Sequence, residues 1–168
     1  MGRASTKENK NYYQVCRESC GLTRAQAEEI LNISDSRIEK IESRKTVAYP
    51  EEILSMAKVY KRPDLCNYYC THECAIGMKT VNEVKSRDLS QIALEILATL
   101  NRLDTEKNRL IEITCDGRID DEKELEDFIA IHKQLKRIGS VIDSLQLWIE
   151  NTVARGEIDA DELERLVK

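Results

Sequence analysis

The sequence predicts an all-α protein, and three observations lead to this prediction. Six glycines and two prolines in 168 residues leave few helix breakers. No segment alternates apolar and polar residues for long, which is the pattern of a half-buried strand. Apolar residues recur instead every three or four positions, as on the buried face of a helix. The length suits one domain of ordinary size or two small ones.

Composition divides the chain into two parts. All six tyrosines, both prolines and five of the six cysteines precede Gly77. Residues 1–79 hold 13 Lys and Arg against 11 Asp and Glu, net +2, which leaves 13 against 20, net −7, for residues 80–168. We therefore expect a flexible polar tail at 1–10, a first domain at 11–78 and a second at 79–168. The weak positive excess would place a nucleic-acid partner on the first domain.

Five short helices are predicted in the first domain, over residues 11–19, 23–31, 35–43, 50–60 and about 63–74. Thr23 and Ser34 suit the N-cap position, where a side-chain oxygen accepts from a backbone N–H of the first turn. Pro50 and Pro63 suit the first turn itself, where a missing N–H costs nothing. Each helix thus has a plausible start in the sequence.

The spacing within Gly21–Glu42 is the most specific local pattern. It gives each of two short helices one apolar face, separated by the tight link Asn32-Ile33-Ser34. Asn32 is the residue of this link best able to take the left-handed conformation usually given to glycine. This arrangement is typical of a helix-turn-helix. The apolar positions are Leu22, Ala27, Leu31, Ile33, Ile38 and Ile41.

GLTRAQAEEILNISDSRIEKIESRK resembles the Cro and lambda-repressor-like helix-turn-helix of XRE-type transcriptional regulators, and YPEEILSMAKVYKRPDL is similar to the helices that follow it in that family. The resemblance covers about residues 11 to 70 and implies a lambda-repressor-like five-helix DNA-binding domain. It also implies that Ser34 to Ser43 forms the recognition helix. Two positions depart from the family pattern, because Glu28 stands where a small Ala is usual and Arg44 where Gly is usual.

A recognition helix in a major groove would direct Asp35, Ser36, Arg37, Glu39 and Lys40 outward. We expect Arg37 to read a guanine edge, since its planar fork donates two bonds to O6 and N7. Ser36 and Lys40 would reach bases or phosphates. Backbone N–H groups at Thr23, with the side chains of Arg24, Arg44 and Lys45, would hold phosphates. The predicted DNA-binding set is Thr23, Arg24, Ser34, Ser36, Arg37, Lys40, Arg44 and Lys45.

A solvated helix face without DNA contacts is the alternative for the same residues. Asp35, Glu39 and Glu42 favour it, because carboxylates beside phosphates oppose binding. The corresponding alternative function is a helical protein-interaction or scaffold module that uses a helix-turn-helix fold.

The second half is expected to form a long antiparallel helical hairpin. Leu89, Ile96, Leu103 and Leu110 recur every seven residues, and after a break at Cys115-Asp116-Gly117 a second apolar series begins, which suits a coiled coil or a bundle. A two-helix hairpin has no complete core, so pairing of two copies into a homodimer through residues 80–168 is predicted; packing of the hairpin on its own first domain is the alternative. Asp159 would cap a final helix. The second series is Phe128, Ile131, Leu135, Ile138, Ile142, Leu145 and Ile149.

The cysteines repeat every four residues. Cys66, Cys70 and Cys74 form one helical stripe, and Cys16 with Cys20 form another that the resemblance places nearby. Five thiols would suffice for a zinc site or an iron–sulfur cluster. Core packing and a thiol redox sensor stay open as alternatives, since cysteine is among the most buried residue types.

Several classes of protein are disfavoured. No run of about 18 apolar residues exists, so no membrane helix is expected. The first ten residues lack the apolar core of an export signal, which predicts a cytoplasmic protein with reduced thiols. There is no phosphate-binding glycine loop and no triad-like arrangement, so the chain is not expected to be an enzyme. The predicted function is sequence-specific regulation of transcription by a homodimer on a palindromic operator, with double-stranded DNA as the partner.

Overall fold

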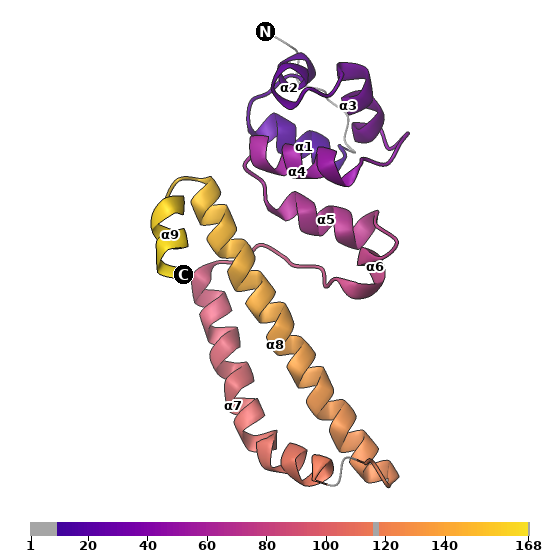
Figure 1. Ribbon diagram of the computed structural model, residues 1–168, viewed down its shortest axis with the longest axis vertical. Helices are drawn as coiled ribbons and strands as arrows, with labels where there is room; N and C mark the ends of the chain where they lie inside the picture. Colours follow the sequence, from indigo (N-terminus) through magenta and orange to yellow (C-terminus); the bar gives the residue numbers. More distant parts are fainter. Residues whose placement is uncertain (1–9, 116–117, 168) are drawn as a thin grey trace. The chain divides into compact units, whose positions relative to one another are not determined.

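The computed structural model describes residues 10–115 and 118–167, and in these ranges the regular structure is helical throughout (Figure 1). This confirms the all-α prediction. Short helices fill the first part of the chain, and two long helices follow. The helices are α1 (Tyr12–Ser19), α2 (Arg24–Leu31), α3 (Asp35–Glu42), α4 (Pro50–Val59), α5 (Asp64–His72), α6 (Gly77–Thr80), α7 (Leu89–Thr114), α8 (Glu122–Ala154) and α9 (Ala160–Val167).

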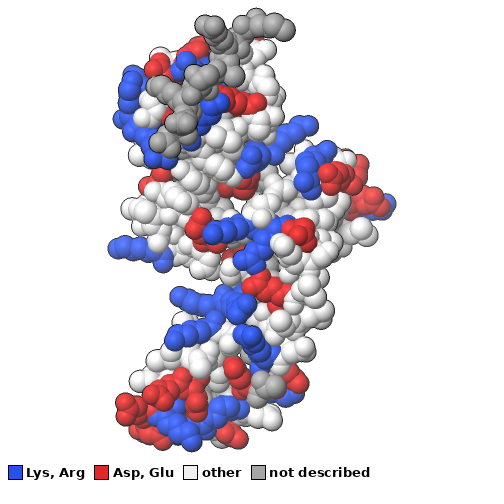
Figure 2. Space-filling view, turned by 180° about the vertical axis from the view of Figure 1, so that it is seen from behind, with Lys and Arg blue, Asp and Glu red and all other residues white. Residues whose placement is uncertain are grey.

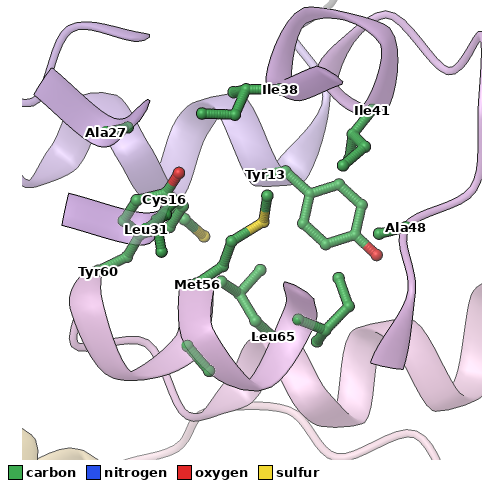
Figure 3. Close-up of a cluster of buried hydrophobic side chains, with 12 residues drawn as sticks. Tyr13, Cys16, Ala27, Leu31, Ile38, Ile41, Ala48, Met56, Tyr60 and Leu65 are labelled. Atoms are coloured by element: carbon green, nitrogen blue, oxygen red, sulfur yellow. The ribbon is translucent and has the colours of Figure 1, made fainter. Parts of the chain in front are cut away.

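The first five helices enclose one apolar core. Helix α2 contacts α3 and α4, α1 contacts α3, and α4 contacts α5. Each helix contributes side chains from one face, as the three-to-four spacing predicts. Figure 3 shows most of these side chains directed into the same interior. The core residues are Tyr13, Cys16, Ala27, Leu31, Ile38, Ile41, Ala48, Ile53, Met56, Ala57, Tyr60 and Leu65.

Local capping explains where these helices begin. Asn11 accepts a hydrogen bond from the N–H of Tyr13, Thr23 from that of Gln26, and Ser34 from that of Arg37. Gln26 returns a bond to Thr23, so that α2 starts with a complete capping box. The caps predicted at Thr23 and Ser34 are therefore confirmed.

The cysteine-bearing helix α5 is shorter than the sequence predicts, because it ends at His72 rather than near residue 74. Glu73 leaves helical geometry, and the chain turns into the four-residue helix α6. Gly77 opens α6 against the backbone of Cys70, where an added Cβ would overlap the carbonyl group. A glycine is required there by this close approach.

Helices α7 and α8 form an antiparallel hairpin, as predicted (Figure 1). Two ion pairs fix their register: Arg109 Nε lies 2.7 Å from Asp127 Oδ2, and Arg137 Nη2 lies 3.3 Å from Glu95 Oε1. The final helix α9 follows, with the N–H of Glu162 donating to Asp159 Oδ1 at 2.9 Å. The predicted cap at Asp159 is thus present.

The chain divides into two compact units, one of Met1–Glu83 with Glu150–Lys168 and one of Val84–Ile149. The C-terminal residues thus group with the helix-turn-helix part, whereas the sequence suggests a single division near residue 78. The predicted boundaries and the assignment of 79–168 to dimerisation stay predictions.

Candidate nucleic-acid interface

Helices α2 and α3 meet through the turn Asn32-Ile33-Ser34, and its geometry is that of a helix-turn-helix. Asn32 has φ 55° and ψ 36°, the left-handed conformation expected for it. Ile38 and Ile41 anchor α3 because both are fully buried. Ser36, Glu39 and Lys40 consequently point away from the core and are exposed. Helix α3 therefore presents a polar outer face, as a recognition helix requires.

The end of α3 explains why a departure from the family pattern is tolerated. The N–H of Lys45 donates to the Lys40 carbonyl at 2.8 Å, and the N–H of Arg44 donates to that of Ile41 at 3.0 Å, which is a Schellman motif. Arg44 occupies the glycine position of this motif with φ 58°. An arginine is thus held in a conformation that favours glycine. The other departure, Glu28, is exposed and disturbs no packing.

Arg37 is the predicted base reader, and the structure gives its side chain another set of partners. Its Nε and Nη2 donate to the two oxygens of Glu52 at 2.9 and 2.8 Å. Nη1 donates to Thr46 Oγ1, Nη2 also donates to the Val47 carbonyl, and the guanidinium lies 4.7 Å from the ring centre of Tyr49. In this conformation Arg37 ties α3 to the 44–49 loop and to α4.

The Arg37–Glu52 pair also changes the ionisation of both groups. The hydrogen bonds that Arg37 donates to Glu52 raise the pKa of Arg37. Burial would raise the pKa of Glu52, but the hydrogen bond and charge of Arg37, with a bond from the Tyr49 N–H, hold it below its usual value. The pair is therefore ionised at neutral pH.

Acidic side chains lie close to several of the predicted phosphate-binding cations. Arg24 Nε lies 3.9 Å from Asp35 Oδ1, and Arg24 Nη1 lies 3.8 Å from Glu39 Oε2. Lys45 Nζ lies 4.0 Å from Glu39 Oε1. Figure 2 shows basic and acidic side chains interspersed over the face of the molecule that it draws. The electrostatic attraction of this surface for a phosphate backbone is accordingly modest.

Glu42 does not contribute to this acidic surface, which corrects the expectation that it opposes DNA binding. It is buried, and its carboxylate accepts from Nε and Nη2 of Arg17 at 2.6 and 2.9 Å. Arg17 donates its third bond to the Leu22 carbonyl. Burial lowers the pKa of Arg17, but the hydrogen bonds and charge of Glu42, together with the charges of Tyr60 and Glu18, leave it above its usual value. The pair joins α1 to the end of α3.

The remaining predicted residues lie around α3. Thr23 opens α2, but its own backbone N–H is already bonded to Gln26 Oε1 at 2.9 Å. Sequence reasoning did not identify Gln26, although a Gln three residues after a Thr is the capping-box pattern. It also did not identify Glu52, since a partner fifteen residues away leaves no local signal. Six of the predicted DNA-binding residues are exposed, namely Thr23, Ser34, Ser36, Lys40, Arg44 and Lys45; Arg24 and Arg37 are half-buried.

The cysteines lie in different environments. Cys16 is buried in the core, where burial raises its pKa to about 12, whereas Cys20 is exposed and donates to the Tyr60 carbonyl at 2.8 Å. Cys66, Cys70 and Cys74 are half-buried. Among the residues that the structure describes, no group of three or more His, Cys, Asp or Glu side chains is arranged to hold a metal ion. Core packing therefore accounts for Cys16, and the zinc and iron–sulfur assignments stay predictions without geometric support.

Comparison with known proteins bears on this surface. Residues 14–67 match a family model described as a helix-turn-helix domain, which is of the Cro type and XRE-like. The resemblance predicted from the sequence is thereby confirmed for this segment. No curated protein and no solved structure matches the chain. No enzyme family is found, and none of the described helices is long and apolar enough to cross a membrane.

Proposed function

We propose that the protein is a sequence-specific DNA-binding transcriptional regulator that acts in the cytoplasm as a homodimer on a palindromic operator. The supporting observation is the α2–turn–α3 unit within residues 14–67, with a left-handed Asn32 and a polar outer face on α3. A helix-turn-helix domain suggests DNA binding, because its second helix fits a major groove. The recognition helix is α3 with its flanking residues, about Ser34–Ser43.

The outer side chains of α3 carry the proposed base contacts. Ser36 and Lys40 are exposed, and Lys40 forms no ion pair with any other residue that the structure describes. Arg44 and Lys45 follow the C-terminal end of α3 and are exposed, and we propose that they hold phosphates. Arg37, with its guanidinium bonded to Glu52 and the 44–49 loop, is proposed to position these cations rather than to read a base.

The homodimer follows from the need to bind two half-sites. Two recognition helices related by a two-fold axis read a palindrome whose half-sites lie about 10 to 10.5 base pairs apart. A single α7–α8 hairpin leaves many large apolar side chains exposed, which supports a second copy as the partner.

A binding titration with matched lysine variants tests the proposal. The fluorescence anisotropy of a labelled duplex from upstream of the protein's own gene is followed at several salt concentrations, with a random-sequence duplex beside it. Lys40→Ala should reduce the preference for the upstream duplex. Lys45→Ala should weaken binding to both duplexes and reduce the salt slope by about 1.

Lys58→Ala is the control, because Lys58 is an exposed lysine on α4. It should leave both affinities unchanged. Equal effects of the three substitutions, or the absence of binding even at low salt, would contradict the proposal.

The alternative of a protein-interaction scaffold is favoured by the carboxylates near Arg24 and Lys45. That alternative predicts no salt-dependent binding to either duplex. The same titration therefore separates the two functions.

A further inference from the structure

The hairpin unit buries one apolar face and also carries exposed apolar side chains. On α7 the side chains of Ile92, Thr99 and Ile113 are buried. On α8, Ile131 and Val141 are buried. These residues form the seam between the two helices. The apolar series predicted from the sequence is divided, because Leu135 and Ile142 belong to it and are exposed.

At two positions an exposed apolar residue follows a buried one directly. Leu100 comes directly after Thr99, and Ile142 comes directly after Val141. Successive side chains of an α-helix lie about 100° apart around its axis. Each helix therefore has a second apolar stripe that is rotated by about 100° from the seam. Because α7 and α8 run antiparallel, this step turns both stripes to the same side of the hairpin. The stripes are Leu89, Ala93, Ile96, Leu100 and Leu103 on α7, and Phe128, Leu135, Ile142 and Ile149 on α8.

The two stripes lie at the same level along the hairpin. The ion pairs Arg109–Asp127 and Arg137–Glu95 bracket this region, so that residues 95–109 run opposite residues 127–137. Leu100 and Leu135 both fall between these two pairs. The stripes therefore form one continuous surface, which we call the second face.

The second face contains no charged residue. The positions between the α8 stripe residues, at helical steps of three and four, are His132, Gly139 and Gln146. An uncharged apolar surface selects against acidic and basic partners and brings no like charges together when it meets its own copy. A two-fold interface requires such self-complementarity.

Gly139 is the second observation. It lies within α8 on the second face, and a Cβ built there would meet no atom within 4 Å. Glycine is the least favourable helix residue after proline, and no neighbour within the described residues requires it at this position. A glycine between Leu135 and Ile142 gives the side chains of an opposing helix room for close approach.

We infer that the second face binds the second face of another copy of this chain, which closes two hairpins into a four-helix bundle. The inference rests on the homodimer of the proposed function and assigns its surface. It gives Leu100, Leu135, Gly139 and Ile142 a place at the centre of the interface.

Sedimentation velocity of the full-length protein tests this assignment. The wild type should sediment as a dimer at micromolar concentration. Gly139→Glu places a charge on the second face in open space, so it should weaken dimerisation at least tenfold while the helical circular dichroism stays unchanged. Leu100→Gln should act in the same direction.

Leu94→Gln is the matched control, because Leu94 is 69% exposed on α7 and lies outside the second face. It should remain dimeric. The assignment would be overturned if the wild type is still monomeric at about 50 μM. It would also be overturned if the Leu94→Gln variant is as monomeric as Gly139→Glu.

DNA binding is measured separately on a duplex with a single half-site. Monomeric Gly139→Glu should bind this duplex with the affinity of wild type and lose only its advantage on a full palindrome. If wild type is dimeric and Gly139→Glu is monomeric but neither binds either duplex, the proposed function fails and the dimer surface stands. If Gly139→Glu sediments as a dimer and both proteins still prefer the palindrome, the surface assignment fails and DNA binding stands.

Discussion

Arg44 combines an unfavourable backbone conformation with a proposed phosphate contact, and replacing it with glycine should separate the two. Its φ of 58° lies in the left-handed region, and the N–H of Lys45 closes the Schellman motif around it. A residue with a Cβ is less stable in this region by about 1 kcal/mol. Glycine also loses more entropy on folding, so Arg44→Gly should raise the free energy of unfolding by roughly 0.5 kcal/mol.

The same substitution should weaken DNA binding. Loss of one phosphate contact reduces the slope of log K against log salt by about 0.9. Arg44→Ala removes the same charge but keeps the Cβ, so its binding defect should match that of Arg44→Gly without the gain in stability. We therefore expect Arg44 to contribute to DNA binding and to lower the free energy of unfolding.

Lys61 supplies the control for backbone conformation. It has φ 53° at the end of α4, where the N–H of Arg62 donates to the Ala57 carbonyl. Lys61→Gly should raise stability as Arg44→Gly does, and it should leave the salt slope unchanged.

Stability is measured by thermal unfolding, followed by the near-ultraviolet circular dichroism of tyrosine, because every tyrosine lies in residues 12–69. Binding is measured by anisotropy as above. An Arg44→Gly variant that binds DNA as wild type does, or a Lys61→Gly variant with the same binding defect, would refute the assigned role of Arg44.

Three further predictions concern the same unit. Arg37→Ala should lower the melting temperature by roughly 10 °C, because it removes about 2 kcal/mol of charge-assisted bonds. Glu52→Gln should lower the melting temperature by less. Its loss of stability relative to wild type should shrink as pH falls below about 4.3, because the depressed pKa of Glu52 stabilises the fold only while the carboxylate is ionised. Asn32→Gly should fold with nearly wild-type stability, whereas Asn32→Ala should lose about 1 kcal/mol in urea unfolding, since φ is 55°. Iodoacetamide should modify exposed Cys20 within the folded protein and buried Cys16 only after unfolding, as peptide mass mapping would show; equal rates would contradict the core assignment of Cys16.

Residues that act through local geometry could be predicted from the sequence. The types and spacing of Thr23, Ser34 and Asn32 predict two caps and the turn, and the structure has these residues there. The short helices followed from apolar periodicity in the same way. These features depend on interactions within a few residues, which a sequence displays directly.

Long-range partners could not be predicted. Arg37 has the side chain and helix position of a base reader, and only the fold shows that Glu52 and Val47 bind its guanidinium. Glu42 looks like an exposed acid until Arg17, twenty-five residues earlier, is found beside it. The apolar series on α8 does not show by itself that Leu135 and Ile142 face outward, because positions on the seam and on the second face are only one residue apart in the sequence.

We propose that α3 reads DNA sequence as one half of a symmetric pair. The most direct measurement is repeated selection of duplexes that bind the full-length protein from a random-sequence pool, followed by sequencing. We expect enrichment of a palindrome with half-sites about 10 to 10.5 base pairs apart, and a changed half-site for Lys40→Ala. A pool that stays random after selection, or an enriched sequence that Lys40→Ala leaves unaltered, would contradict it.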